Sequence, residues 1–165
     1  MREVRKVISV TVKEIALDQA MNPVVLLIDA EQSKVLPIWV GPFEARAIAL
    51  SLQATPVPRP MTHDLMKNLC DQLGAEVAKV VVSNIYEGTY YAEIYLQRGG
   101  KEMVIDARPS DAIALALRTG ANLYITEEVA AYALDLEEVA DEEEKELLKK
   151  WLAGEQMQDD NQLLQ

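Results

Sequence analysis

Hydrophobic and polar positions divide the chain into six strand-like stretches and four helical ones. Alternation is clearest over residues 7–12 and 91–96, where successive side chains suit opposite faces of a strand. The six stretches are Val4–Ile15, Val24–Asp29, Lys34–Val40, Glu76–Ile85, Thr89–Gln97 and Glu102–Asp106. Glycine-containing turns at residues 87–88 and 98–101 favour hairpins in the second set of three. The pattern therefore predicts two sets of three strands.

Each set of strands leads into an alanine-rich helix that starts with proline. Pro42 and Pro109 suit the first helical position, because the missing N–H of proline would be unpaired there anyway. Glu44 and Asp111 follow in the first turns, where a negative charge complements the helix dipole. The two segments match at a spacing of 67 residues, which indicates an internal repeat of β-β-β-α units over about 4–52 and 76–119, bridged by a helix over 62–73.

The predicted fold class is α+β, with both units in one domain over residues 1–135. A unit of about 65 residues buries little core alone, so two separate domains fit less well. Residues 136–165 are assigned to an acidic C-terminal helix and tail. The net charge of −11 comes mainly from this end, since residues 135–165 hold eleven acids and three bases, and residues 1–134 hold sixteen acids and thirteen bases.

The predicted C-terminal helix, Asp141–Ala153, carries an apolar face. This face includes Leu147, Leu148, Trp151 and Leu152. It either docks on its own domain or a neighbouring subunit, or recruits another protein. Because this face and the exposed strand edges need covering, we expect a homo-oligomer.

Three features favour a cytoplasmic protein without a membrane segment. The first residues lead directly into an alternating strand, unlike a secretory signal. No apolar run approaches the roughly 20 residues of a membrane helix. Cys70 is the single cysteine, so no internal disulfide is available, and it is expected to be a buried, inert thiol.

The junction before the second alanine-rich helix concentrates charged side chains. Asp106, Arg108 and Asp111 lie within six residues, where a strand is predicted to turn into a helix. Both copies of the repeat have an acid at the equivalent position, Glu44 in the first and Asp111 in the second, and these two acids are interpreted as mainly structural. Asp106 and Arg108 occur in one copy only, so they suit a functional site as well as a capped helix start.

A second candidate segment precedes the bridging helix. Alternate prolines hold residues 56–60 extended, and Thr62 is a natural N-cap. His63, the only histidine, and Asp64 then fall in the first turn. The helix dipole favours a neutral imidazole there, which suits a general base. A first-turn histidine is also common as an ordinary surface or cap residue.

These two segments resemble the bifunctional nuclease domain family. The longest matching motifs are Pro58–Leu65 and Ile105–Ala116, with Leu36–Gly41 and Glu44-Ala45 as the first block and Thr126–Val129 as the close. The resemblance covers roughly residues 5–135 and implies nuclease activity on RNA and DNA. It points to Arg59, His63, Asp64, Asp106, Arg108 and Asp111, and in a second tier to Glu44, Arg46 and Asn68. A C-terminal motif that some members share with nucleotide-excision-repair proteins has no counterpart in this tail.

Two nuclease mechanisms could use these residues. In the first, Asp106, Asp111 and Glu44 or Asp64 hold Mg²⁺ or Mn²⁺, which prefer carboxylate oxygens and activate a bound water. In the second, His63 acts as a base, and Arg108 with the helix start at Pro109 binds the phosphate. Substrate contacts are assigned to Arg59, Arg46 and Asn68.

The charge distribution favours a rival function. The basic residues are scattered, whereas nucleic-acid binders usually present a basic face, and no phosphate loop or aromatic stacking motif is present. Asp106, Arg108 and Asp111 could instead form a structural ion-pair network in a regulatory or anionic-ligand-binding module. A nuclease requires the His63 and Asp106–Asp111 segments to converge in an open cleft, whereas a scaffold pairs them and closes them off.

Overall fold

The structure is a computed structural model that describes residues 5–135. Its strands are β1 (Val7–Leu17), β2 (Pro23–Asp29), β3 (Lys34–Trp39), β4 (Glu76–Tyr86), β5 (Thr89–Arg98), β6 (Lys101–Ala107), β7 (Asn122–Thr126) and β8 (Leu134–Asp135). Its helices are α1 (Pro42–Leu52), α2 (Thr62–Gln72), α3 (Pro109–Thr119) and α4 (Glu127–Ala130). The predicted α+β class and all six predicted strands are confirmed. The predicted C-terminal helix and tail lie outside the described residues.

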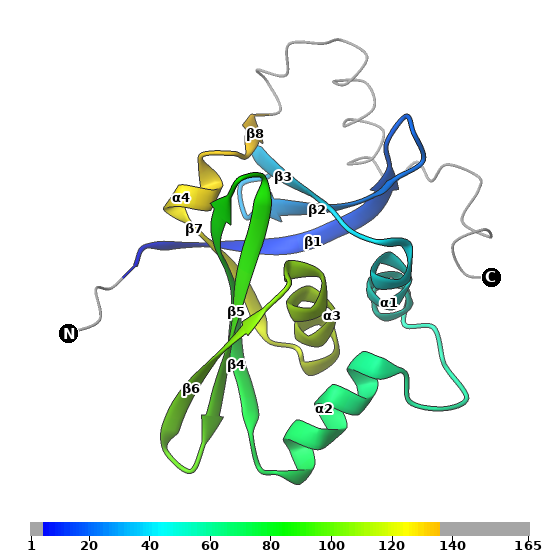
Figure 1. Ribbon diagram of the computed structural model, residues 1–165, viewed down its shortest axis with the longest axis vertical. Helices are drawn as coiled ribbons and strands as arrows, with labels where there is room; N and C mark the ends of the chain where they lie inside the picture. The colour runs from blue at the N-terminus through cyan, green and yellow to red at the C-terminus, as the bar shows by residue number, and fades with distance from the viewer. Residues whose placement is uncertain (1–4, 136–165) are drawn as a thin grey trace.

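All the strands form one sheet in the order β6-β5-β4-β7-β1-β2-β3-β8 (Figure 1). The strands β1–β3 form one antiparallel set, and β4–β6 form another. The strand β7, which the sequence pattern did not predict, joins them by pairing parallel to β4 and antiparallel to β1. Each set precedes a helix, α1 or α3, as the suggested repeat requires; its origin by duplication remains a prediction.

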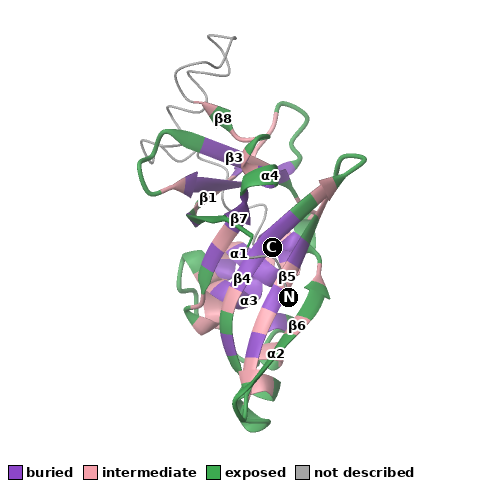
Figure 2. Cartoon of the chain, turned by 90° about the vertical axis from the view of Figure 1, so that its left-hand side faces the viewer, coloured by how far each residue is buried: buried purple, intermediate pink, exposed green. Residues whose placement is uncertain are grey.

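The helix α3 lies at the centre of the core, between the sheet and its neighbours α1 and α2 (Figure 1). Residues 112–116 are at most 4% exposed, because alanines alternate with large aliphatic side chains and let neighbouring elements approach closely. Figure 2 shows the buried residues continuing along β4 and β5. This packing fixes where the N-terminal turns of the helices lie. No helix of the described residues is long and apolar enough to cross a membrane.

The start of α2 differs from the prediction by one residue. Thr62 is the first helical residue rather than the N-cap, which is Met61. The Met61 N–H donates to Asp64 Oδ2 at 2.9 Å, the contact that an acid makes with an N-cap three residues before it. His63 and Asp64 nevertheless lie in the first turn, as predicted.

Gly120 ends α3 in the left-handed backbone conformation, with φ +73°. No atom would contact an added Cβ, so Gly120→Ala tests backbone strain alone. We expect this variant to lower the free energy of unfolding by about 1–2 kcal/mol, measured by urea denaturation. The matched control is Gln53→Ala at the end of α1, where the backbone is right-handed at φ −88°. Equal stability of both variants would contradict the prediction.

Candidate functional site

The N-terminal turns of α1, α2 and α3 meet through their polar side chains. His63, the second residue of α2, places Nε2 2.9 Å from Asp111 Oδ1 in the first turn of α3. The His63 side chain is only 9% exposed. Two segments that the sequence analysis selected separately therefore converge.

Arg108 connects this pair to α1. It is the N-cap of α3; its Nε donates to Asp111 Oδ2 at 2.8 Å, and its Nη1 donates to Glu44 Oε1 at 3.0 Å. A Cβ at position 41 would collide with the Glu44 carboxylate, so Gly41 lets Glu44 fold back over the start of α1. We call His63, Asp111, Arg108 and Glu44 the charge cluster. Its most exposed member is Arg108, at 63% of its side chain.

Asp64 belongs to a neighbouring structural contact instead. Its Oδ1 accepts from Arg118 Nε at 2.8 Å, while its Oδ2 caps Met61. Arg118 also donates to the carbonyls of Ala114 and Ala47, and its side chain is 7% exposed. Asp64 therefore serves to join α2 to α3. Arg118 was not selected from the sequence, although it directly follows the apolar run 112–117, where a lone arginine indicates a partner.

Asp106 is not brought to the charge cluster. It is exposed on β6 directly opposite Glu93 on β5. The residues flanking Glu93 are Ala92 and Ile94, which are buried against the helices, so Glu93 and Asp106 point to the other face of the sheet. Strand alternation thus separates Asp106 from Asp111.

The predicted substrate-binding residues make no hydrogen bond to the charge cluster within residues 5–135. Arg59 and Asn68 are exposed. Arg46 is half-buried, and its Nε is buried without a hydrogen-bond partner among the described residues. None of the three is placed in the cluster by a contact.

The arrangement does not fit the predicted Mg²⁺ or Mn²⁺ ligand set. Asp111 and Glu44 both bind the guanidinium of Arg108, which occupies the position between them, and Asp106 lies on the other face of the sheet. Over the described range, no three histidine, cysteine or acidic residues form a group suited to a metal ion. In this arrangement Asp111 and Glu44 serve as ion-pair partners of Arg108.

The environment of Asp111 favours its ionised form. Burial by itself raises the pKa of this carboxyl, but hydrogen bonds from Arg108 and His63 outweigh burial and lower the pKa. Burial opposes the ionised form of Asp64 as well, yet the Met61 N–H and Arg118 lower its pKa. Hydrogen bonds to Asp111 and Glu44 raise the pKa of Arg108. Within the charge cluster, Asp111 and Arg108 therefore hold each other in the ionised form.

The lowered pKa values of Asp64 and Asp111 predict acid-sensitive stability. Such carboxylates stabilise the fold above their unfolded-state pKa, about 3.9, and this contribution is lost as the pH falls through the folded-state value. We therefore expect the free energy of unfolding to decline below about pH 4, as measured by urea denaturation. Asp111→Asn should show a shallower decline, whereas Glu87→Gln, in the exposed β4–β5 turn, should retain the full decline. An unaltered slope in Asp111→Asn would refute this assignment.

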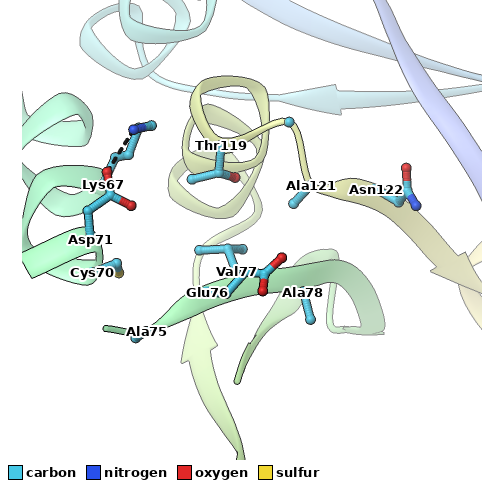
Figure 3. Close-up of a pocket in the computed structure, with 11 residues that line it drawn as sticks. Lys67, Cys70, Asp71, Ala75, Glu76, Val77, Ala78, Thr119, Ala121 and Asn122 are labelled. Carbon is cyan, nitrogen blue, oxygen red and sulfur yellow. Dashed lines mark hydrogen bonds and ion pairs between the residues drawn. The ribbon is translucent and has the colours of Figure 1, made fainter. Parts of the chain in front are cut away.

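An open pocket of about 340 Å³ lies at the other end of α2 (Figure 3). It is bounded by the last turn of α2, the start of β4 and the α3–β7 connection. Its residues include Cys70, which is half-buried rather than fully buried as expected, and the ion pair of Lys67 with Asp71. No member of the charge cluster lines this pocket.

Comparisons with known proteins agree with the sequence motifs. A model of the bifunctional nuclease domain matches residues 25–136. An uncharacterised protein of Mycobacterium tuberculosis strain H37Rv is 43% identical over 136 residues, which cover 81% of each chain. Bifunctional nuclease 2 of Arabidopsis thaliana is 30% identical over 100 residues, covering 59% of this chain and 30% of the plant protein. Bifunctional nuclease 1 of Oryza sativa subsp. indica is 26% identical over 112 residues, covering 66% and 34%. The matched region therefore forms only a part of these plant proteins.

Proposed function

Because this chain belongs to the bifunctional nuclease domain family, we propose that it hydrolyses phosphodiester bonds in RNA and DNA at the charge cluster. The convergence of His63 and Arg108 where three helices begin carries the proposal. The N-terminus of each helix bears a partial positive charge and unpaired N–H groups, which favour a bound anion. A phosphodiester is such an anion.

Arg108 is the proposed phosphate-binding residue. Its exposed guanidinium makes single hydrogen bonds to Asp111 and Glu44 and retains further N–H donors for phosphate oxygens. The Asp111 contact through Nε holds the guanidinium plane in place. The second hydrogen of Nη1 and both hydrogens of Nη2 are the donors left for a phosphate, so the substrate can bind while Asp111 and Glu44 stay in place.

His63 is the proposed general base. An ionised Asp111 can only accept hydrogen bonds, so the His63 Nε2 beside it must carry a proton. In the neutral imidazole the lone pair is then on Nδ1. This nitrogen takes a proton from a water molecule, whose oxygen attacks phosphorus as the bond to the leaving oxygen breaks and solvent protonates that oxygen. Asp111 orients the imidazole and stabilises the cation that forms.

A second candidate function is a non-catalytic regulatory or anion-binding module. It is favoured by the pairing of both cluster carboxylates with Arg108 and by the burial of His63. In this alternative, the same contacts lock three helix starts together. Arg108 would bind an anion without cleaving it.

Cleavage assays separate the two functions. Purified protein is incubated with labelled single- and double-stranded RNA and DNA, in EDTA and with Mg²⁺ or Mn²⁺. We expect cleavage that co-purifies with the protein and is lost in Arg108→Met, whereas Arg98→Met, at the exposed end of β5, stays active. Activity that persists in Arg108→Met would indicate a contaminant or a different site. Absence of cleavage under every condition would favour the binding module.

A further inference from the structure

We propose that the C-terminal segment 141–153, which lies outside the described residues, docks on the face of β1, β2 and β3 that is turned away from α1. This inference goes beyond the proposed function and does not depend on it. It starts from a small apolar cluster that the candidate site does not use, and we call it the far-face cluster. Its members are Ala16, Val24, Leu26, Ile28 and Val35.

Strand alternation separates the far-face cluster from the main core. Along β2, Val25 and Leu27 belong to the main core, together with Ile48 of α1. Successive side chains of a strand point to opposite faces, so Leu26 points away from α1 with the rest of the far-face cluster. Within residues 5–135, every member of this cluster belongs to a strand, and no helix contributes a residue to it.

The far-face cluster is nevertheless buried. Leu26 and Val35 are 0% exposed, and Val24 is 1% exposed. The sequence of β2 agrees, because Val24–Ile28 is an unbroken apolar run, and such runs are typical of strands that are covered on both faces. The helices of residues 5–135 cover one face only. The far-face cluster therefore requires a cover from another part of the chain or from another molecule.

The described chain ends beside this face. The last strand, β8, pairs with β3, and Leu134 lies directly opposite Val35 of the far-face cluster (Figure 1). Only residues 136–140 separate Asp135 from the predicted helix, and a linker of that length spans at most about 18 Å. The strands β8 and β2 are two places apart in the sheet, which corresponds to about 10 Å. The segment of the same chain can therefore reach the far-face cluster.

The chemistry of the segment fits an uncharged apolar surface. Its sequence predicts a helix with one apolar face, and this face consists of Leu147, Leu148, Trp151 and Leu152. The equivalent face of β5 and β6 is a poorer partner, because it carries Glu93 and Asp106, whose charges oppose both apolar contact and an acidic segment. The far-face cluster contains no charged residue. Charge and hydrophobicity therefore direct the segment to β1, β2 and β3.

Tryptophan fluorescence of the full-length protein tests the docking. Trp39 and Trp151 are the only two tryptophans, so Trp39→Phe leaves Trp151 as the sole reporter. We expect blue-shifted emission and weak quenching by acrylamide, because a docked indole is shielded from water. In this background Ile28→Gln, which places a polar group in the far-face cluster, should shift the emission to the red and strengthen quenching severalfold. The matched control is Ile8→Gln, since Ile8 is 37% exposed on the helix-covered face and should leave the emission unchanged.

Photo-crosslinking identifies the docking surface without altering it. A photoreactive phenylalanine analogue replaces Leu148 in a mixture of isotope-labelled and unlabelled protein that is refolded together from urea, and the crosslinked peptides are identified by mass spectrometry. We expect crosslinks to residues 23–39 of the same chain. Crosslinks confined to α2, or a Trp151 that is fully open to acrylamide, would overturn the proposal. Crosslinks between labelled and unlabelled chains would overturn it too, because the occupant would then be the segment of a second copy.

Discussion

Replacing His63 with glutamine is expected to slow phosphodiester cleavage by about 10²- to 10⁴-fold, the usual contribution of a positioned general base. Glutamine can still donate a hydrogen bond toward Asp111, so the link between α2 and α3 is preserved while the basic nitrogen is lost. Initial rates on labelled single-stranded RNA and DNA measure the effect. Substrate affinity should change little, because Arg108 and not His63 is assigned to the phosphate.

The matched control for His63→Gln is Gln72→Ala, an exposed change at the other end of the same helix. It should retain wild-type rates. Urea denaturation of both variants separates lost chemistry from lost folding. A folded His63→Gln protein that keeps more than about a tenth of wild-type activity would place the base elsewhere. In that event the charge cluster would be a helix junction rather than a catalytic centre.

The strands were predictable because their signal is local. Alternation identified β1 to β6 within a few residues, since burial of one sheet face imposes a period of two on each strand. The five-residue strand β7 was missed because so short a segment after a helix has little alternation. Its pairing with both β4 and β1 depends on the whole sheet. Local sequence therefore predicts which residues form strands, whereas the order of the strands in the sheet depends on contacts between distant segments.

The candidate site was predictable only in part, for the same reason. The convergence of His63 with Asp111 depends on how α2 packs against α3, and no local pattern states that packing. By contrast, the local sequence did indicate that Asp106 lies away from the charge cluster. In β6, Met103 and Ile105 alternate with Glu102 and Asp106, which already assigns the acids to the other face. Clustering of charges in sequence was therefore a weaker guide than strand periodicity.

Other expectations from the sequence stay predictions. The acidic C-terminal helix lies outside the described residues. Homo-oligomerisation also stays a prediction, and the surface on which to test it is α2, where Leu65, Leu69 and Leu73 form an exposed row at a spacing of four residues. Cytoplasmic location and a protein partner for the tail rest on composition alone.

Replacing Arg118 with methionine is expected to lower the free energy of unfolding by about 2–3 kcal/mol. Methionine keeps the apolar stem in the core but removes the guanidinium donors through which Arg118 joins α3 to α1 and α2. The Ala47 carbonyl and Asp64 Oδ1 then lose their guanidinium partners. Asp64 is partly exposed, so water offsets some of the loss and the effect stays below that of a fully buried pair. Urea denaturation at neutral pH measures the change.

Arg98→Met provides the comparison, because Arg98 is exposed at the end of β5 and its replacement should change stability by no more than about 0.5 kcal/mol. A similarly small effect at Arg118 would mean that apolar packing of α3, and not its buried arginine, sets the positions of the helix starts. The expected large effect has a functional consequence. The Arg118 contacts hold α1, α2 and α3 in the relation that brings Glu44, His63 and Asp111 within reach of Arg108. Cleavage should therefore fall in Arg118→Met even at temperatures where the protein remains folded, since small displacements of catalytic groups reduce rates steeply.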